Sequence, residues 1–339
     1  MRKVSMQDIA DNLGISRVTV WKALNNRSGV SEETRQKIFE NAEEMGFFSS
    51  NSHLNNNLLS QKNVAVVVSR PDSSSFWLQI IHELARYLSK ENINLLYIYL
   101  PSNYSKSYKL PKSLTSGDID TMLVLNVYST ELLNMLNALP MHKIFLDLTP
   151  ELDTGKTNGD LLFLEGKDSI YRITKKLLDV GKKKVAFVGD INYARTNLER
   201  YRGYQQAFEE KNIPEPKELC LLDKIPIDKY PQTVDKYIED FASNLPEAFV
   251  CANDHLAYLI ASYFKSIDYD FSEKIILTGY DNLKEYQAIT GDITTVDVDT
   301  KTLGQILAQK IMFRLISNNT SREISYISFP IIFRGELDT

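Results

Sequence analysis

The first fifty residues carry three short apolar patterns with the spacing of helices. The first pattern ends at Gly14, where a residue with left-handed backbone commonly ends a helix. Ser16 stands where it can cap a second helix, and the third pattern begins at Ser31 and ends at Gly46. The inward-facing residues of the first two helices are Met6, Ile9, Ala10, Leu13, Val20, Ala23 and Leu24. This arrangement predicts a helix-turn-helix headpiece, whose second helix enters the major groove of DNA.

After a stretch rich in serine and asparagine, the apolar pattern changes to strands that alternate with amphipathic helices. The stretch, "SSNSHLNNNLLSQKN", has the composition of a linker. Strands are expected at "VAVVVS", "INLLYIYL", "TMLVLN" and "KIFLDL", and in a second series at "DLLFLE", "KVAFVG", "CLLD", "EAFVCA" and "KIILTGYD". Helices are expected near 75–90, 130–138, 167–180, 197–211, 229–243 and 254–266. This alternation predicts parallel sheets with helices on both faces.

The two series predict two lobes with a ligand cleft between them. The last strand patterns, "ITTVDV" and "ISYISFPIIFRG", flank a helix near 300–317, so the chain is expected to return to the first lobe. We therefore predict an all-α headpiece at 1–48, a hinge at 49–62 and an α/β effector-binding and dimerisation domain at 63–339. Its first lobe takes about 63–157 and 291–319, and its second takes about 158–290 and 320–339. Ligands of such sheets bind beyond the carboxyl ends of the strands, where the two lobes face each other.

Composition and charge limit the class of protein and the extent of any DNA contact. Hydrophobic residues make up 43% of the 339 residues and charged residues 24%, and no apolar run approaches the roughly 18 residues that span a bilayer. The start of the chain has no secretory signal, so we expect a cytoplasmic protein without a membrane partner. The net charge is -5, but residues 1–27 carry five basic and two acidic side chains. DNA contact is therefore expected only at the headpiece.

The usual signatures of catalysis, cofactors and metals are missing from the sequence. The glycines of "GK" at Gly155 and Gly166 lack the partner glycine of a phosphate-binding loop, and no predicted strand is followed by G-x-G-x-x-G. No G-x-S-x-G nucleophile motif occurs. Cys220, Cys251 and the four histidines have no spacing typical of zinc ligands, so reduced, buried thiols are expected. We predict no catalytic activity, no cofactor and no metal.

Polar side chains follow the ends of several predicted strands. Asn126, Asp147, Asn253, Asp254 and Asp281 each stand where a strand should reach the cleft. Any one of them is equally well explained as a cap for the following helix. Together they favour a ligand-binding site.

Three further residues give this candidate site its chemistry. Arg200 in "ERYRGY" offers a planar fork of donors, and Phe76 or Trp77 can cover an apolar face of a sugar. The alternatives are a surface ion pair for Arg200 and ordinary core packing for the two aromatic residues. Carboxylates, amides and a guanidinium arranged around neighbouring hydroxyls predict a sugar-binding site.

The sequence resembles the LacI/GalR family of bacterial transcription regulators over nearly its whole length. The segment "VSMQDIADNLGISRVTVWKALNNRSGVSEETRQKIFENAEEMGF" is similar to the family headpiece. Six later segments resemble successive motifs of the family's effector domain, in the expected order: "RYRGY", "CANDHLAYLIA", "ILTGYD", "ITTVDVD", "LGQ" and "FPIIFRG". The resemblance implies a homodimer, or a larger assembly, that binds operator DNA. It also implies a periplasmic-binding-protein-like domain that closes on a small-molecule effector.

The resemblance implies roles for individual residues as well. The residues that it places against base edges are Arg17, Val18 and Lys22. Those that it places against phosphates, which position the headpiece without reading sequence, are Ser5, Thr19, Asn25, Ser31 and Thr34. The residues that match the effector-contacting positions of the family are Asn126, Asp147, Arg200, Asn253 and Asp281.

The sequence departs from the family pattern in two places. Trp21 stands where the family usually has a small hydroxyl residue, so its indole is expected to pack on the sugar–phosphate edge of the DNA. Ser49 and "LNNNLL" stand where the family commonly has a proline and an Ala-Arg-x-Leu hinge helix. Leu58 is the best candidate for the leucine that wedges into the minor groove, with Leu54 or Leu59 as alternatives. Since asparagine has low helix propensity, we expect residues 50–60 to become helical only when two copies meet on DNA.

These observations predict a cytoplasmic, dimeric transcription regulator that represses carbohydrate-utilisation genes in response to a sugar or sugar derivative. The first alternative is the same regulator with a nucleobase effector or a phosphoprotein partner. The second is a transport-linked sugar-binding protein, which conflicts with the headpiece and the missing secretory signal. The third is a doubly wound enzyme, for which the sequence offers no turnover site.

Overall fold

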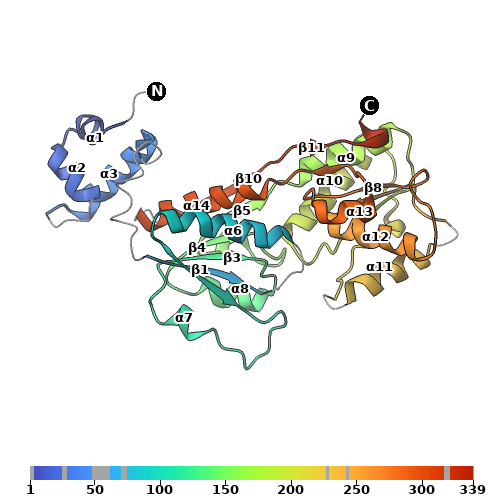
Figure 1. Ribbon diagram of the computed structural model, residues 1–339, viewed down its shortest axis with the longest axis horizontal. Helices are drawn as coiled ribbons and strands as arrows, with labels where there is room; N and C mark the ends of the chain where they lie inside the picture. The colour runs from blue at the N-terminus through green and yellow to red at the C-terminus, as the bar shows by residue number, and fades with distance from the viewer. Residues whose placement is uncertain are drawn as a thin grey trace.

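The computed structural model describes residues 4–24, 29–47, 62–69, 75–226, 229–241, 244–316 and 321–338. They form a small helical headpiece and a larger α/β domain (Figure 1). The predicted fold class, an all-α headpiece followed by a two-lobed domain with parallel sheets, is confirmed. None of the described helices is long and apolar enough to cross a membrane. Asn25, Leu58 and hinge residues 49–61 lie outside the described residues.

The headpiece consists of α1 (Met6–Leu13), α2 (Arg17–Leu24) and α3 (Glu32–Glu44). Gly14 ends α1 with a φ of +65°, and the Oγ of Ser16 accepts from the backbone N–H of Thr19 at 3.0 Å, so both turn predictions are confirmed. The buried cluster that holds the three helices together is Ile9, Ala10, Val20, Ala23, Leu24, Ile38, Phe39, Ala42 and Phe47. This cluster leaves one side of α2 exposed.

The first lobe is built on a six-stranded parallel sheet in the order β10-β5-β4-β3-β1-β2. Its strands are β1 (Asn63–Val68), β2 (Asn94–Tyr99), β3 (Thr121–Leu125), β4 (His142–Leu146), β5 (Asp160–Leu164) and β10 (Ile324–Ile327). Alternate residues of β1 enter the buried clusters on opposite faces of the sheet. One cluster includes side chains of α6 (Ser75–Lys90) and α14 (Thr300–Ile316), and the other includes those of α7 (Lys112–Thr115) and α8 (Thr130–Asn137).

Helices α6 and α14 pack against each other at close range. A Cβ atom at Gly304 of α14 would lie 2.8 Å from the Cβ of Glu83 and 3.1 Å from the carbonyl oxygen of Ile80, both on α6. The two helices run side by side toward the headpiece in Figure 1, and Ile316 at the end of α14 packs against the headpiece cluster. Glycine is therefore required for the spacing of this pair.

The second lobe contains a three-stranded parallel sheet of β6 (Val185–Val188), β7 (Ala248–Cys251) and β8 (Ile276–Thr278). Its helices are α9 (Lys167–Asp179), α10 (Arg195–Lys211), α11 (Tyr230–Glu239), α12 (Asp254–Ser266) and the short α13 (Gln287–Thr290). Strands β9 (Thr295–Val296) and β11 (Ile331–Ile332) pair antiparallel. Among the described residues, 3-10 turns of this lobe are η2 (Lys217–Leu219), η4 (Lys284–Tyr286) and η5 (Gly335–Leu337), while η1 (Thr154–Lys156) lies between β4 and β5 of the first lobe.

The division of the chain between the lobes differs from the predicted one. Residues 158–290 and 320–339 were expected in the second lobe, but β5 and β10 belong to the sheet of the first. Conversely, the segment before α14 joins the second lobe, where Thr294 bridges Thr278 of β8. "CLLD" forms only an isolated bridge between Leu221 and Val188. The reason is that "DLLFLE" is buried on both faces, so its apolar run fits either sheet equally well.

Candidate functional site

The exposed side of α2 carries the residues predicted to read DNA. Val18 is 60% exposed and Trp21 43%, Arg17 is exposed, and Lys22 is half-buried. Val20, Ala23 and Leu24 fill the opposite side of the helix. The outward side chains are therefore available to a partner without disturbing the headpiece core.

The hydroxyl residues predicted to contact phosphates lie at helix N-termini. Ser5 caps α1 by accepting from the backbone N–H of Asp8, and Ser31 caps α3 by accepting from the N–H of Thr34. The Thr19 hydroxyl lies 2.8 Å from that of Ser16 at the start of α2. Capping explains why serine and threonine stand here, so their phosphate contacts stay a prediction. Helix N-termini with outward-facing hydroxyls are nonetheless suited to phosphate oxygens.

A pocket of about 480 Å³ lies between the two lobes. The structure brings together around it all seven residues predicted to contact the effector, which are Phe76, Trp77, Asn126, Asp147, Arg200, Asn253 and Asp281. Four of them, Asn126, Asp147, Asn253 and Asp281, follow the carboxyl ends of parallel strands, as the topology requires. Whether they bind an effector is not decided by their position, and that role stays a prediction.

The backbone is unusual at three of the strand ends. Asn126, Asp147 and Asp281 have φ values of 52°, 70° and 112°, a backbone region that residues other than glycine rarely adopt. Asparagine and aspartate tolerate it better than most residues, which explains why these types stand at these turns. Such backbone conformations gather where side chains serve a function, and here all three residues line the pocket.

Arg200 is held in a fixed position at the base of the pocket. Its side chain is only 5% exposed, and its Nη1 donates to the carbonyl oxygen of Ala252 at 2.5 Å. The guanidinium carbon lies 3.5 Å from the centre of the Tyr280 ring, while a Cβ at Gly166 would lie 2.6 Å from the Cγ of Arg200. Nε is buried and has no hydrogen-bond acceptor among the described residues. The alternative of a surface ion pair is therefore wrong for Arg200.

The two acidic residues of the pocket have different surroundings. Asp147 accepts from the hydroxyl of Thr196 at 2.5 Å and from the backbone N–H of Leu148 at 2.8 Å. Burial raises the pKa of Asp147, although these bonds oppose the shift. Burial raises the pKa of Asp281 well above its ordinary value, because desolvation outweighs the attraction of Arg200. Both carboxyls can thus donate or accept a hydrogen bond, depending on protonation.

Asp147 and Arg195 also connect the lobes. Asp147 follows β4 in the first lobe, and its partner Thr196 lies on α10 in the second. The backbone N–H of Arg195 donates to the carbonyl of Leu148 at 2.7 Å, and its Nη2 donates to the carbonyls of Pro150 and Leu152. These bonds fix the N-terminal end of α10 to the first lobe.

Helix capping accounts for part of the strand-end pattern. Asn253 caps α12, since its Oδ1 accepts from the N–H of Leu256 at 3.0 Å, and its amide nitrogen remains for the pocket. Asp254 does not line the pocket. It accepts from the N–H of Leu283 and from the hydroxyl of Thr295, and burial raises its pKa to about 6. Asp254 is therefore a structural residue of the second lobe.

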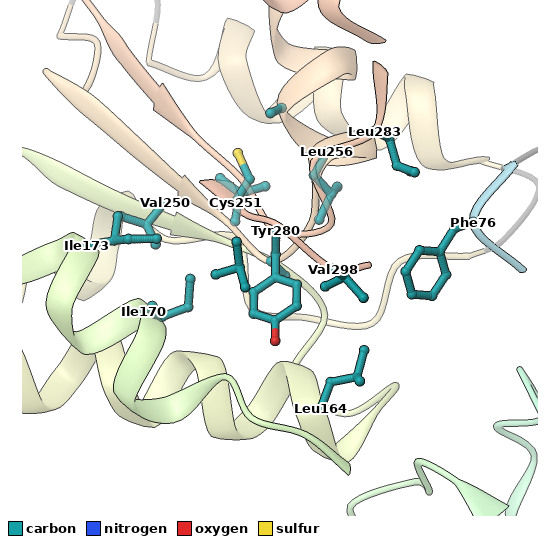
Figure 2. Close-up of a cluster of buried hydrophobic side chains, with 14 of the residues drawn as sticks. Phe76, Leu164, Ile170, Ile173, Val250, Cys251, Leu256, Tyr280, Leu283 and Val298 are labelled. Carbon is teal, nitrogen blue, oxygen red and sulfur yellow. The ribbon is translucent and has the colours of Figure 1, made fainter. Parts of the chain in front are cut away.

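The aromatic residues at the mouth have mixed roles. Phe76 is 5% exposed and belongs to the main buried cluster, and Figure 2 shows it at the edge of that cluster. It also lines the pocket. Trp77 is half-buried and meets Phe76 edge-on, with ring centres 5.0 Å apart. Core packing, the alternative considered from the sequence, is thus part of the explanation for Phe76.

The sequence did not reveal several further lining residues, which are Tyr128, Tyr193, Thr196, Asn197, Tyr230, His255 and Tyr286. Tyr128 and Tyr193 come from opposite lobes, and their ring centres lie 4.3 Å apart. Two of them could have been predicted from their place in the sequence, because Tyr128 follows the same strand as Asn126 and His255 lies in the first turn after Asn253. Thr196, Asn197 and Tyr230 lie at the starts of α10 and α11, where the sequence does not show which side chains face the cleft.

Two hollows of similar volume lie elsewhere in the described part of the chain. One, of about 510 Å³, lies between α12, α13 and η5 in the second lobe, and one, of about 560 Å³, lies beside α14. Neither is at the carboxyl ends of the parallel strands, and neither gathers the predicted residues. No group of histidine, cysteine, aspartate or glutamate residues within the described ranges is arranged to hold a metal ion.

Two family models match the chain in succession. Residues 5–50 match bacterial regulatory proteins of the lacI family, and residues 174–335 match the periplasmic binding protein-like domain. The chain thus joins a DNA-binding region of the lacI family to a periplasmic binding protein-like domain. The two matches agree with the headpiece and with the pocket between two lobes.

Relatives and solved structures are similar to this chain over most or all of its length. The chain is 22% identical over 337 residues to the HTH-type transcriptional repressor PurR of Aliivibrio fischeri (strain MJ11), covering 98% of each chain. It is 24% identical over 341 residues to PurR of Histophilus somni (strain 2336), covering 99% of each. A complex of the transcriptional regulator CelR with cellobiose superposes with a TM-score of 0.70 at 16% identity, covering 98% of this chain and 99% of that one. A LacI family regulator from Enterococcus faecium with bound ribose has a TM-score of 0.66 at 18% identity, covering 80% and 97%.

Proposed function

We propose that this protein is a homodimeric repressor of carbohydrate-utilisation genes, controlled by a sugar bound between its lobes. DNA binding and transcription regulation rest on the match of residues 5–50 to bacterial regulatory proteins of the lacI family. The sugar rests mainly on one observation, which is the pocket with Arg200, its free Nε donor, and Asp281 at its base. A donor and an acceptor at one end of a polar pocket suit the neighbouring hydroxyls of a sugar.

Several observations support a sugar over the alternative effectors. The pocket has one cationic side chain, Arg200, within the described ranges, and two acidic ones, so a phosphate group would face carboxyls. The rings of the Tyr128–Tyr193 and Phe76–Trp77 pairs contact each other, with ring centres 4.3 and 5.0 Å apart, so neither pair forms a slot between two rings for a flat nucleobase. Relatives of known structure also include complexes with cellobiose and with ribose.

In this proposal the headpiece recognises DNA with Arg17, Val18 and Lys22 at base edges. Ser5, Thr19, Trp21, Asn25, Ser31 and Thr34 would contact the backbone. Leu58 of the hinge would enter the minor groove, and residues 50–60 would order only on operator DNA. Amide hydrogen exchange tests the hinge, since equal protection in free, operator-bound and effector-bound protein would contradict ordering on DNA. Such a regulator acts in the cytoplasm, where the bacterial chromosome lies.

One experiment tests the link between pocket and DNA. The operator is first selected from random double-stranded DNA with the full-length protein, and a thermal-shift screen then identifies sugars that stabilise the fold. A sugar that raises the melting temperature is expected to change operator affinity at least tenfold, measured by fluorescence anisotropy. Operator binding that stays unchanged with every stabilising sugar would contradict the proposed control.

A further inference from the structure

Three aromatic side chains of the second lobe form a continuous surface at one side of the pocket. Tyr230 opens α11, His255 lies in the first turn of α12 and Tyr286 ends η4. The His255 and Tyr286 ring centres are 5.5 Å apart, and those of Tyr230 and His255 are 6.4 Å apart. All three are half-buried and line the pocket. We call them the aromatic shelf.

The shelf is held in place from behind. The Nδ1 of His255 lies 3.1 Å from the hydroxyl of Tyr286, at hydrogen-bonding distance. Tyr258 on α12 stacks on Tyr286 with ring centres 4.8 Å apart and an angle of 30°, and it does not line the pocket. A surface whose rings are fixed before binding loses little conformational entropy when a ligand packs on it.

The pocket is larger than a single sugar needs. Its volume of about 480 Å³ equals that of roughly 16 water molecules at about 30 Å³ each. A pyranose has about twelve non-hydrogen atoms, and bonded atoms occupy less space than separate waters, so one ring leaves much of the volume empty. The polar residues at the strand ends can surround one such ring. The remaining space is bounded in part by the aromatic shelf.

The chemistry of the shelf selects what fills that space. A pyranose has a face that exposes mainly C–H bonds, and such a face packs favourably on aromatic rings. Its hydroxyls at the ring edge can meet the polar edge formed by His255 and Tyr286. Arg200 is the one arginine of the lining within the described ranges and no lysine joins it, so the shelf itself has no lysine or arginine that would favour an anionic group.

We propose that the effector is an uncharged saccharide of at least two sugar units, with the first unit among Asn126, Arg200 and Asp281 and the next on the aromatic shelf. This inference rests on the proposed function, because it specifies the ligand of the same pocket. The shelf then determines the length of the saccharide, whereas the strand-end residues bind the first unit.

The test compares sugars and their dimers on the full-length protein by calorimetry. Glucose is paired with cellobiose and maltose, galactose with lactose and melibiose, and xylose with xylobiose. At least one disaccharide is expected to bind more than tenfold tighter than either of its component sugars. Glucose 6-phosphate and hypoxanthine complete the panel and are expected not to bind.

Shelf variants connect the preference to these residues. Tyr230→Ala and Tyr286→Ala are expected to weaken disaccharide binding about tenfold and to leave binding of the component sugar within twofold. Tyr286→Phe keeps the ring and is expected to retain most of the affinity, which gives a folded comparison if an alanine variant is unstable. Tyr269→Ala, another half-buried tyrosine of the second lobe that lies outside this pocket, is the matched control and should change neither affinity.

The outcomes separate the two proposals. If single sugars bind as tightly as disaccharides, or if the shelf variants weaken both equally, the inference is overturned while sugar binding stands. If glucose 6-phosphate or hypoxanthine binds and no saccharide does, the proposed sugar effector is overturned as well. If nothing in the panel binds, both are overturned for these sugars.

Discussion

The candidate DNA surface and the candidate effector pocket are built in opposite ways. Arg17, Val18, Trp21 and Lys22 lie within one eight-residue helix, in which the first three are exposed and Lys22 is half-buried. The pocket takes its residues from both lobes, and Asn126, Asp147 and Arg200 are almost completely buried. Exposed side chains contribute little to stability, whereas buried polar ones contribute to folding and binding together. Substitutions in the headpiece should therefore separate binding from stability, and those in the pocket should not.

The largest effect is expected for Arg200→Ala. Removing the guanidinium leaves the Ala252 carbonyl without its buried donor and takes away the positive charge near Asp281, so effector affinity should fall by about 4 kcal/mol, roughly a thousandfold. The free energy of unfolding should fall as well, by about 1–3 kcal/mol. Calorimetry measures the effector affinity, and urea unfolding measures the free energy of unfolding. The control is Arg202→Ala on the same helix, which removes only an exposed pair with Glu199. An Arg200→Ala protein with wild-type affinity would show that the residue is purely structural.

A pH-dependent effect of similar size is expected from Asp254. Its pKa is raised from an ordinary value of 3.8 to about 6, so the folded protein holds the proton more tightly than the unfolded chain. Its contribution to stability is fully present below pH 3.8 and is lost as the pH rises through about 6, a change of about 3 kcal/mol. Asp254→Asn removes this titration.

Urea unfolding of wild type and Asp254→Asn between pH 4 and 7.5 measures it. The variant should gain stability relative to wild type as the pH rises. A constant difference across the range would mean that the carboxyl titrates normally in the folded protein.

An intermediate effect on binding alone is expected for the exposed side chains of α2. Arg17→Ala and Lys22→Ala should each weaken operator binding by about 1–3 kcal/mol and relax the preference at one base position. Their unfolding free energies should stay within about 0.5 kcal/mol of wild type. Lys37→Ala, which removes an exposed pair with Glu33 on α3, is the control. An unchanged base-preference profile would exclude both residues from sequence reading.

The smallest effect is expected at the cap of α2. Ser16→Ala removes the hydroxyl that accepts from the N–H of Thr19, which should lower headpiece stability by about 1 kcal/mol. Operator binding should weaken equally for all sequences, because the helix is less often formed but its reading residues are intact. A selective change at one base position would instead place Ser16 itself at the DNA.

Local patterns in the sequence predicted the headpiece better than they predicted the lobes. Gly14 and Ser16 lie where helix-ending chemistry requires them, since a left-handed residue and a cap depend only on neighbouring residues. The assignment of β5 to the second lobe was wrong, because a strand buried on both faces carries no information about which sheet it joins.

The pocket shows the same contrast. Asn126, Asp147 and Asp281 were predicted to gather because parallel strands bring their carboxyl ends to one edge. Tyr230 and Tyr286 were not, because the placement of α11 and η4 beside the pocket is set by packing between elements that are distant in sequence. The helix caps were a genuine ambiguity, and the structure shows Asn253 as a cap that also borders the pocket.

The tight packing of α14 on α6 at Gly304 lets the two helices move as one rigid unit. Phe76 and Trp77 stand at the pocket end of α6, a helix of 16 residues and thus about 24 Å long. If a ligand turned that end by about 10°, the far end would sweep about 4 Å, because a helix of this length rotates as a rigid rod. We expect α14 to move together with α6, because the two helices are in close contact at Gly304. A displacement of about 4 Å is larger than the range of distances over which a hydrogen bond to a DNA base can form. A small rotation at the pocket therefore suffices to misalign a headpiece that is connected to the far end of these helices.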